Sequence, residues 1–171
     1  MRYETNKDSS FVLQPKSTYT HPMARKRFDD MPCSIAQTLN LVGDWWTLLI
    51  IRDAFFGARR FAEFETRLGI AKNILANRLS QLVENGIMQK VDIGQTGTHY
   101  AYELTEKGRD LFPVLTALRQ WGDKWVYGEG CAPMDVIERK SGRPLARMVP
   151  LGADGTPVAL EDLEIRLKEK S

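Results

Sequence analysis

Residues 69–86 have the sequence GIAKNILANRLSQLVENG, and this stretch decides the fold of the chain. Apolar residues recur in it at helical spacing, which predicts a helix with one buried face. These residues are Leu75, Leu79, Leu82 and Val83. The opposite side is polar and no acidic residue precedes Glu84, so a polyanion could approach the N-terminal half without like-charge repulsion. On pattern alone, an ordinary amphipathic surface helix is the commoner interpretation.

The flanking segments favour a more specific interpretation. Residues 60–68 predict a short helix, and a turn containing Gly69 joins it to the next helix with helix-turn-helix spacing. Downstream, residues 87–93 are β-prone, residues 94–97 are rich in turn formers, and residues 98–104 alternate as a second strand. Helix, turn, helix and hairpin, in this order, predict a winged helix in which the hairpin is the wing.

Further helices are predicted on both sides of this motif. Asp44 is placed as the N-cap of a buried helix that runs through Ile50. Thr105 can cap a helix over residues 106–127, in which Pro113 should kink or restart the backbone because it lacks an N–H donor. This long helix carries a stripe of large apolar side chains that is too extensive to be left in water.

The stripe needs a partner surface, and the simplest one is a second subunit related by a twofold axis. The predicted dimerisation residues are Ile35, Leu39, Val42, Leu111, Leu115, Leu118, Trp121 and Trp125. A twofold dimer would place two recognition helices one turn of DNA apart, on a roughly palindromic site. The alternative is packing within the monomer, against the C-terminal segment.

Composition sets the class of protein and the domain limits. At 171 residues, 43% hydrophobic and 27% charged, the chain is typical of one globular domain with a small appendage. The predicted fold class is α+β and mainly helical, a winged helix-turn-helix with a long dimerisation helix and a small C-terminal β-hairpin module. We expect a flexible N-terminal extension over residues 1–30, the winged-helix domain over 31–128, and the hairpin appendage over 129–171.

Charge and apolar runs constrain partners and location. The formal net charge of +2 is too small to indicate a nucleic-acid binder by itself, so any positive patch must be local. No run approaches the roughly 18 apolar residues that span a bilayer, and the first residues lack the apolar core of a secretory signal. The sequence therefore predicts a cytoplasmic protein without a membrane partner, with Cys33 and Cys131 as thiols.

Several motifs resemble one family with their separations preserved. Residues 43–53 (GDWWTLLIIRD) and 57–64 (GARRFAEF) are similar to the HxlR-type branch of bacterial MarR-like winged-helix regulators, and residues 102–108 (YELTEKG) continue the pattern in register. The resemblance covers roughly residues 33–127 and implies a homodimeric DNA-binding protein. One departure is Trp45, where the family commonly has a basic residue, so no phosphate contact is carried over to this position.

The C-terminal segment departs from some relatives that carry a ribbon with paired cysteines spaced for zinc. Here the segment has only Cys131 and no histidine, so the four ligands of a structural zinc site are absent and we expect no metal. Two short strands, over residues 136–140 and 145–149, are predicted instead. This hairpin could bind a ligand or support the dimer.

Candidate DNA contacts follow from side-chain chemistry. Asn73 and Asn77 are the candidates for base readout, because a carboxamide can pair bidentately with adenine in the major groove. Lys72 and Arg78 would bind phosphates or guanine. Contacts to the DNA backbone or minor groove are predicted for the wing tip and for the start of the preceding helix. These residues are Gln95, Thr96, Thr98 and His99, together with Arg59 and Arg60.

Cys33 matches the position of a cysteine that often opens this family's domain and that, in some relatives, senses oxidants or electrophiles. A thiolate is the reactive form of cysteine and is favoured near a helix N-terminus. The alternative interpretation is a small buried hydrophobic residue without reactivity.

Enzymatic function is not indicated. The chain has two histidines, His21 and His99, and neither has a nearby pattern of nucleophile, base and orienting acid. It has no phosphate-binding GxxxxGK[ST] and no dinucleotide-binding GxGxxG, so we expect no cofactor. The sequence predicts a homodimeric transcriptional regulator, a repressor of palindromic operators that responds to a small-molecule inducer or a redox signal. The alternative is a winged-helix protein-interaction module that does not bind DNA.

Overall fold

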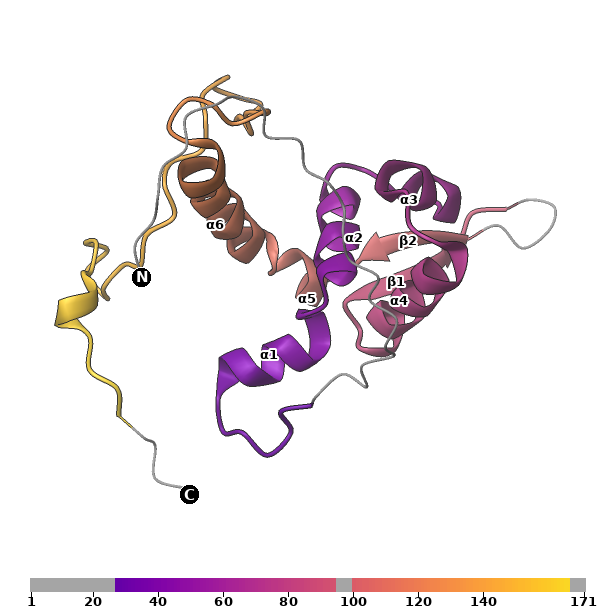
Figure 1. Ribbon diagram of the computed structural model, residues 1–171, viewed down its shortest axis with the longest axis horizontal. Coiled ribbons are helices and arrows are strands. Elements are labelled where there is room, and N and C mark those ends of the chain that lie inside the picture. The colour runs from indigo at the N-terminus through magenta and orange to yellow at the C-terminus, as the bar shows by residue number, and fades with distance from the viewer. Residues whose placement is uncertain (1–26, 95–99, 167–171) are drawn as a thin grey trace, which may run out of the picture.

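A helix-turn-helix and a two-stranded hairpin form the centre of the computed structural model, which describes residues 27–94 and 100–166 (Figure 1). The first four helices are α1 (Ser34–Val42), α2 (Trp45–Phe55), α3 (Phe61–Leu68) and α4 (Lys72–Glu84). They are followed by β1 (Met88–Asp92), β2 (Tyr100–Leu104), α5 (Glu106–Arg109) and α6 (Phe112–Gly122). A π-helical turn, Asp123–Tyr127, extends α6, and a 3-10 turn, Leu160–Asp162, lies in the C-terminal segment. The predicted winged helix-turn-helix and the mainly helical α+β fold class are confirmed.

The hydrophobic core lies between α2, α3, α4 and the hairpin. Its largest fully buried side chains are Phe64, Ile50, Ile51, Leu75, Leu79, Leu82, Ile87 and Met88. Three of these come from α4 at positions 75, 79 and 82, so the apolar side of residues 69–86 is buried as its periodicity predicts. The polar side of α4 is consequently turned away from the core.

The predicted wing is present as an antiparallel pair. Met88 of β1 lies opposite Leu104 of β2, and Asp92 lies opposite Tyr100. Figure 1 shows the two strands beside α3 and α4, on the side of the molecule away from α6. The predicted contact residues at its tip, Gln95, Thr96, Thr98 and His99, lie outside the described residues and stay predictions.

Helix ends follow the capping residues that the sequence offers. The Asp44 carboxylate accepts hydrogen bonds from the backbone N–H groups of Trp46 (3.0 Å) and Thr47 (3.3 Å), so the predicted N-cap of α2 is confirmed. Thr105 accepts from the N–H of Gly108 in the same way at the start of α5. At the turn between α3 and α4, Gly69 has φ +59°, a left-handed conformation that glycine adopts without strain.

The predicted helix over residues 106–127 is divided. α5 ends at Arg109, and α6 begins at Phe112 with Pro113 in its first turn, where a missing N–H donor breaks no helical hydrogen bond. The expected restart at Pro113 is therefore confirmed, whereas one long helix is wrong. Across the two ranges that the structure describes, none of the helices combines the length and hydropathy needed to cross a membrane.

The C-terminal arm, residues 129–166, is less regular than predicted. The strands expected over residues 136–140 and 145–149 are wrong, because a single bridge, Ile137 to Pro144, joins these segments. The two hydrogen bonds of this bridge come from the N–H groups of Glu138 and Leu145, and the pairing does not continue into a ladder. The arm is instead attached to α6 by Gln120. Its side-chain amide donates to the carbonyl of Ala146 (2.8 Å) and accepts from the N–H of Met148 (2.7 Å).

Candidate nucleic-acid interface

The outward side of α4 is the centre of the candidate interface. Lys72, Asn73 and Asn77 are all exposed, and they come from the first two turns of the helix. The N-cap position is Ala71, whose side chain cannot accept a hydrogen bond, so no side chain caps the first N–H groups of α4. Two carboxamides, one ammonium group and uncapped N–H donors thus face solvent at one end of one helix.

Lys72 has a neighbour that sequence reasoning missed. Its Nζ lies 3.7 Å from Oε1 of Glu65 on α3, although the stretch around Lys72 contains no acid. The lysine side chain is 76% exposed, and an exposed ion pair of this length stabilises by well under about 1 kcal/mol. The ammonium group can therefore leave Glu65 for a stronger anion.

Arg78 requires a correction. We expected it to bind phosphate or guanine, but its Nη2 donates to Oδ2 of Asp44 at 3.0 Å, and its Nη1 donates to Gln81. The Arg78 side chain is only 22% exposed. Helical periodicity could not reveal this, because Asp44 is distant in sequence and is brought near only by the packing of α2 against α4. Arg78 ties the recognition helix to the N-cap of α2.

The two arginines before α3 are placed differently from each other. The guanidinium group of Arg59 forms an ion pair with Glu103 on β2. The backbone carbonyl of Arg59 accepts a hydrogen bond from the backbone N–H of Tyr102 (2.7 Å). Arg60 is exposed at the N-cap of α3. Glu63 accepts hydrogen bonds from the backbone N–H groups of Arg59 and then Arg60, which lower the pKa of its carboxyl group. The loop before α3 is thus held against the wing strand.

Lys90 on the wing is a further cation that sequence reasoning missed. Its ammonium group lies 5.6 Å from the ring centres of both Tyr100 and Tyr102. Tyr102 is its direct partner in the strand register. The hairpin pattern contained the signal, since residues 90 and 102 face each other once the strands are aligned. Lys90 therefore places a positive charge in the middle of β1.

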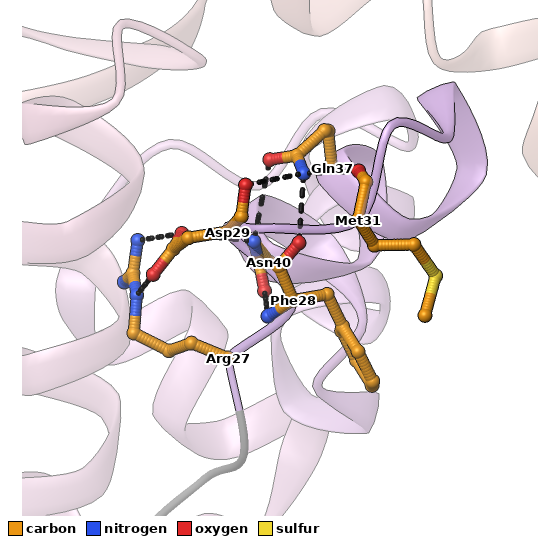
Figure 2. Close-up of polar contacts among 6 residues, drawn as sticks. All are labelled: Arg27, Phe28, Asp29, Met31, Gln37 and Asn40. Carbon is orange, nitrogen blue, oxygen red and sulfur yellow. Dashed lines mark hydrogen bonds and ion pairs between the residues drawn. The ribbon is translucent and has the colours of Figure 1, made fainter.

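Figure 2 shows how the segment before α1 is held. The side-chain amide of Gln37 donates to the carbonyls of Phe28 and Met31, each at 2.8 Å. Asn40 accepts from the N–H of Phe28 at 2.9 Å. These contacts fix residues 27–31 along α1 and place Cys33 at its N-cap. Cys33 is exposed, so the interpretation as a buried hydrophobic residue is wrong.

The predicted dimerisation residues fall into two groups. Those that remain exposed in the single chain are Ile35, Leu39, Leu118, Trp121 and Trp125. Leu111 and Leu115 are half-buried against the core, and Val42 is 5% exposed within it. The prediction that Val42 lies at a dimer interface is therefore wrong: Val42 belongs to the core, because the end of α1 packs on α2. Figure 1 shows α1 and α6 on the side of the molecule away from the wing.

Comparison with known proteins agrees with this geometry. Residues 41–129 match the family model of the HxlR-like helix-turn-helix. Over 93 residues the chain is 46% identical to an uncharacterized HTH-type transcriptional regulator of Mycobacterium tuberculosis. That match spans 54% of this chain and 59% of the relative, so less than two thirds of the relative's length is matched.

Two solved structures are also similar to this chain. The crystal structure of PA1607, a candidate transcription factor, is similar with a TM-score of 0.76 and 44% identity, over 82% of this chain and 98% of that chain. The reduced form of the redox regulator HypR is similar with a TM-score of 0.51 and 28% identity, over 55% of this chain and 96% of that chain. The first likeness includes part of the C-terminal arm, whereas the second covers about the length of the winged helix.

Proposed function

This chain belongs to the HxlR-like helix-turn-helix family of transcriptional regulators, and we propose that it binds duplex DNA in a sequence-specific manner as a homodimer. In this proposal it is a repressor whose operator binding is released by a small molecule or a redox signal. The observation that carries the proposal is that α4 has one apolar, buried side and one polar, exposed side. On one side Leu75, Leu79 and Leu82 are buried in the core, and the outward side presents Lys72, Asn73 and Asn77.

These groups suit the chemistry of the major groove. The carboxamides of Asn73 and Asn77 can pair with the N6 and N7 atoms of adenine, and Lys72 can bind a backbone phosphate. The uncapped N-terminus of α4 adds N–H donors for a second phosphate. Two further cations, Arg60 at the N-cap of α3 and Lys90 on β1, are available for phosphate contacts. The predicted tip residues of the wing complete the proposed contact.

The alternative is a winged-helix module that binds another protein. An apolar outward face on α4 would favour this alternative. However, Ile74 is the single exposed large apolar residue of α4, and it is only 38% exposed. Selection of this protein on random duplex DNA separates the two functions. We expect enrichment of a palindrome whose half-sites lie about one helical turn apart. A selected pool that is no different from the starting pool would support the protein-interaction module instead.

Lys72→Ala and Asn77→Ala should have different effects on DNA binding. Lys72→Ala should weaken binding to all duplexes and reduce the salt slope by roughly one unit, because one phosphate contact is lost. Asn77→Ala should cost about 1–3 kcal/mol on the selected operator only. Titration by fluorescence anisotropy at several salt concentrations measures both effects. Lys140→Ala, which removes the same charge from the C-terminal arm, is the matched control and should behave as the parent.

An equal loss of affinity for operator and for random DNA in both variants would contradict this assignment. If both variants weaken operator and random DNA to the same extent, α4 does not divide phosphate contact and base readout between these two residues. If Lys140→Ala changes the salt slope as much as Lys72→Ala, the effect comes from net charge and not from a contact on α4.

A redox signal is the second part of the proposal, and Cys33 is the candidate sensor. Two observations support it: the thiol is exposed at the N-cap of α1, and the similar protein HypR is a redox regulator. Diamide takes two electrons and two protons from two thiols, here the Cys33 thiols of two copies of the chain, and leaves a disulfide between them. We expect it to lower operator affinity by roughly tenfold in the parent and in Cys131→Ser, and to have no effect on Cys33→Ser. Dithiothreitol should restore binding.

Two results would exclude Cys33 as the sensor. In one, diamide leaves operator binding of the parent unchanged. In the other, Cys33→Ser still loses binding when treated, which would transfer the effect to Cys131 or to another group.

A further inference from the structure

Asp44 uses its two carboxylate oxygens for two different contacts. Its Oδ1 accepts hydrogen bonds from the N–H groups of Trp46 and Thr47 and so caps α2. Its Oδ2 accepts a hydrogen bond from Nη2 of Arg78 on α4, at 3.0 Å. One carboxylate therefore closes the start of α2 and at the same time holds a side chain of the recognition helix.

The guanidinium group of Arg78 is enclosed at this contact. Its Nη1 donates to Oε1 of Gln81 at 2.9 Å, and its Nε is buried without a hydrogen-bond partner among the described residues. The side chains of Arg78 and Asp44 are 22% and 16% exposed. Removing one member of so enclosed a pair leaves the other charge with little water and no counter-charge, which is costly. This pair is therefore a firmer contact than the exposed ion pair of Lys72.

The ion pair adds a direction to the packing of α2 against α4. Ile50 of α2 and Leu79 of α4 belong to one core cluster, and the burial of apolar surface is non-directional. A hydrogen bond, in contrast, requires its donor and acceptor to be aligned. The contact of Arg78 with Asp44 therefore restricts rotation of α4 about its own axis. The same restriction sets the direction of Asn77, the preceding residue on the helix.

We propose that Arg78 and Asp44 are positioning residues for DNA binding and that neither of them contacts DNA. This inference rests on the proposed function, since it concerns how Asn73 and Asn77 are aimed at the bases. A carboxamide must be placed accurately to pair bidentately with adenine, whereas a lysine binds phosphate as a point charge. Displacement of α4 should therefore weaken base readout more than it weakens phosphate contact.

The link between the two helices is tested first without DNA, on the full chain. Asp44→Ser keeps a capping hydroxyl that is too short to reach Arg78, and Arg78→Met keeps an unbranched side chain without donors. Each change should raise the equilibrium constant of urea unfolding. In the double variant, the increase should be at least fivefold smaller than the product of the two single effects. An increase equal to that product would overturn the link.

Operator titration then tests positioning, at a temperature at which circular dichroism shows every variant to be folded. Asp44→Ser and Arg78→Met should each lower affinity for the selected operator at least fivefold and affinity for random DNA less than twofold. The salt slope should stay unchanged, and the double variant should lose no more than either single variant. A pair that only supported the fold would leave the ratio of operator to random affinity as in the parent, and that result would overturn the inference.

Direct contact of Arg78 with DNA predicts the opposite result for Asp44. Loss of the carboxylate would release the guanidinium group, so Asp44→Ser would bind DNA more tightly than the parent. Arg78→Met would then reduce the salt slope by roughly one unit, because a phosphate contact is lost. Either result would show that Arg78 acts on DNA itself and would overturn the positioning role.

Two matched controls separate this pair from its surroundings. Asp44→Ala removes the cap as well as the ion pair, so it should be less stable than Asp44→Ser but bind the operator equally well. A lower operator affinity in Asp44→Ala would transfer the effect to the cap. Arg119→Met breaks the ion pair with Asp123 on the extension of α6, whose side chains are 30% and 27% exposed. It should leave the ratio of operator to random affinity unchanged.

The controls and the two stages of the experiment fix what each failure means. A change of this ratio in Arg119→Met as large as in Arg78→Met would show that any lost ion pair has this effect, and the inference would fail. If the chain binds no DNA, the proposed function fails and the positioning role fails with it. The urea experiment would still decide whether Asp44 and Arg78 couple α2 to α4.

Discussion

Trp121→Glu should convert the proposed dimer into monomers and weaken operator binding by roughly 10²–10⁴-fold, because two linked half-site contacts become one. Trp121 is 59% exposed in the single chain, so a charge there does not disturb the core. In a dimer, however, the same charge would be buried without a partner, which costs several kcal/mol. Sedimentation velocity and operator titration measure the two effects, and circular dichroism checks that the helices remain.

Trp125→Glu should act in the same direction. The ammonium group of Lys124 lies 4.6 Å from the ring centre of Trp125, so this change also removes a cation–π contact, and Trp121→Glu is the cleaner variant. Leu160→Glu is the matched control, because Leu160 is an exposed apolar residue on the arm rather than on α6. It should leave both mass and operator affinity unchanged. If the parent protein is monomeric at micromolar concentration, the dimer proposal fails at its first step.

The fold was predictable because its signals are local. The period of the leucines in α4, the N-cap at Asp44 and the glycine turn at Gly69 each depend on a few neighbouring residues. Restart of the helix at Pro113 has the same origin, since one missing N–H decides it. Sequence patterns of this kind specify which elements form and which side of each is buried.

The candidate site was predictable only in part, because side-chain partners are set by tertiary contacts. A polar residue on α4 can face DNA or a neighbouring helix, and periodicity does not distinguish Asn77 from Arg78, which is held by Asp44. Val42 belongs to the apolar side of α1, but whether that side meets α2 or a second subunit depends on how α1 packs. The strand content of the arm was overestimated, because alternating apolar residues resemble strands even where the pairing stops at one bridge.

The segment Thr105–Gly108 illustrates how a short motif is fixed by backbone contacts. The hydroxyl of Thr105 donates to the carbonyl of Gly86 at 2.7 Å, and its N–H donates to the carbonyl of Ile87 at 3.1 Å. Lys107 donates to the carbonyl of Asn85 at 2.9 Å. The motif therefore binds the loop between α4 and β1, and it sets how the recognition helix and the wing are joined.

Gly108→Ala should destabilise the protein by about 3 kcal/mol and lower its Tm by about 10 °C. A Cβ atom at this buried position would lie 2.2 Å from the carbonyl oxygen of Ile87 and 3.0 Å from a methyl group of Leu104. The carbonyl cannot withdraw easily, because it accepts a hydrogen bond from the N–H of Thr105, whose hydroxyl is itself held by the neighbouring carbonyl of Gly86. The added methyl group must then separate α5 from the start of the wing.

Gly122→Ala is the matched control for this prediction. Gly122 has φ −63° at the end of α6, and a Cβ atom there meets nothing within 4 Å. Because alanine has the higher helix propensity, this variant should be as stable as the parent or more stable by up to about 1 kcal/mol. Urea denaturation of the three proteins measures the difference. Equal stability of the two variants would mean that α5 yields to a side chain at Gly108, and the close approach to Ile87 would then not be what requires glycine in this motif.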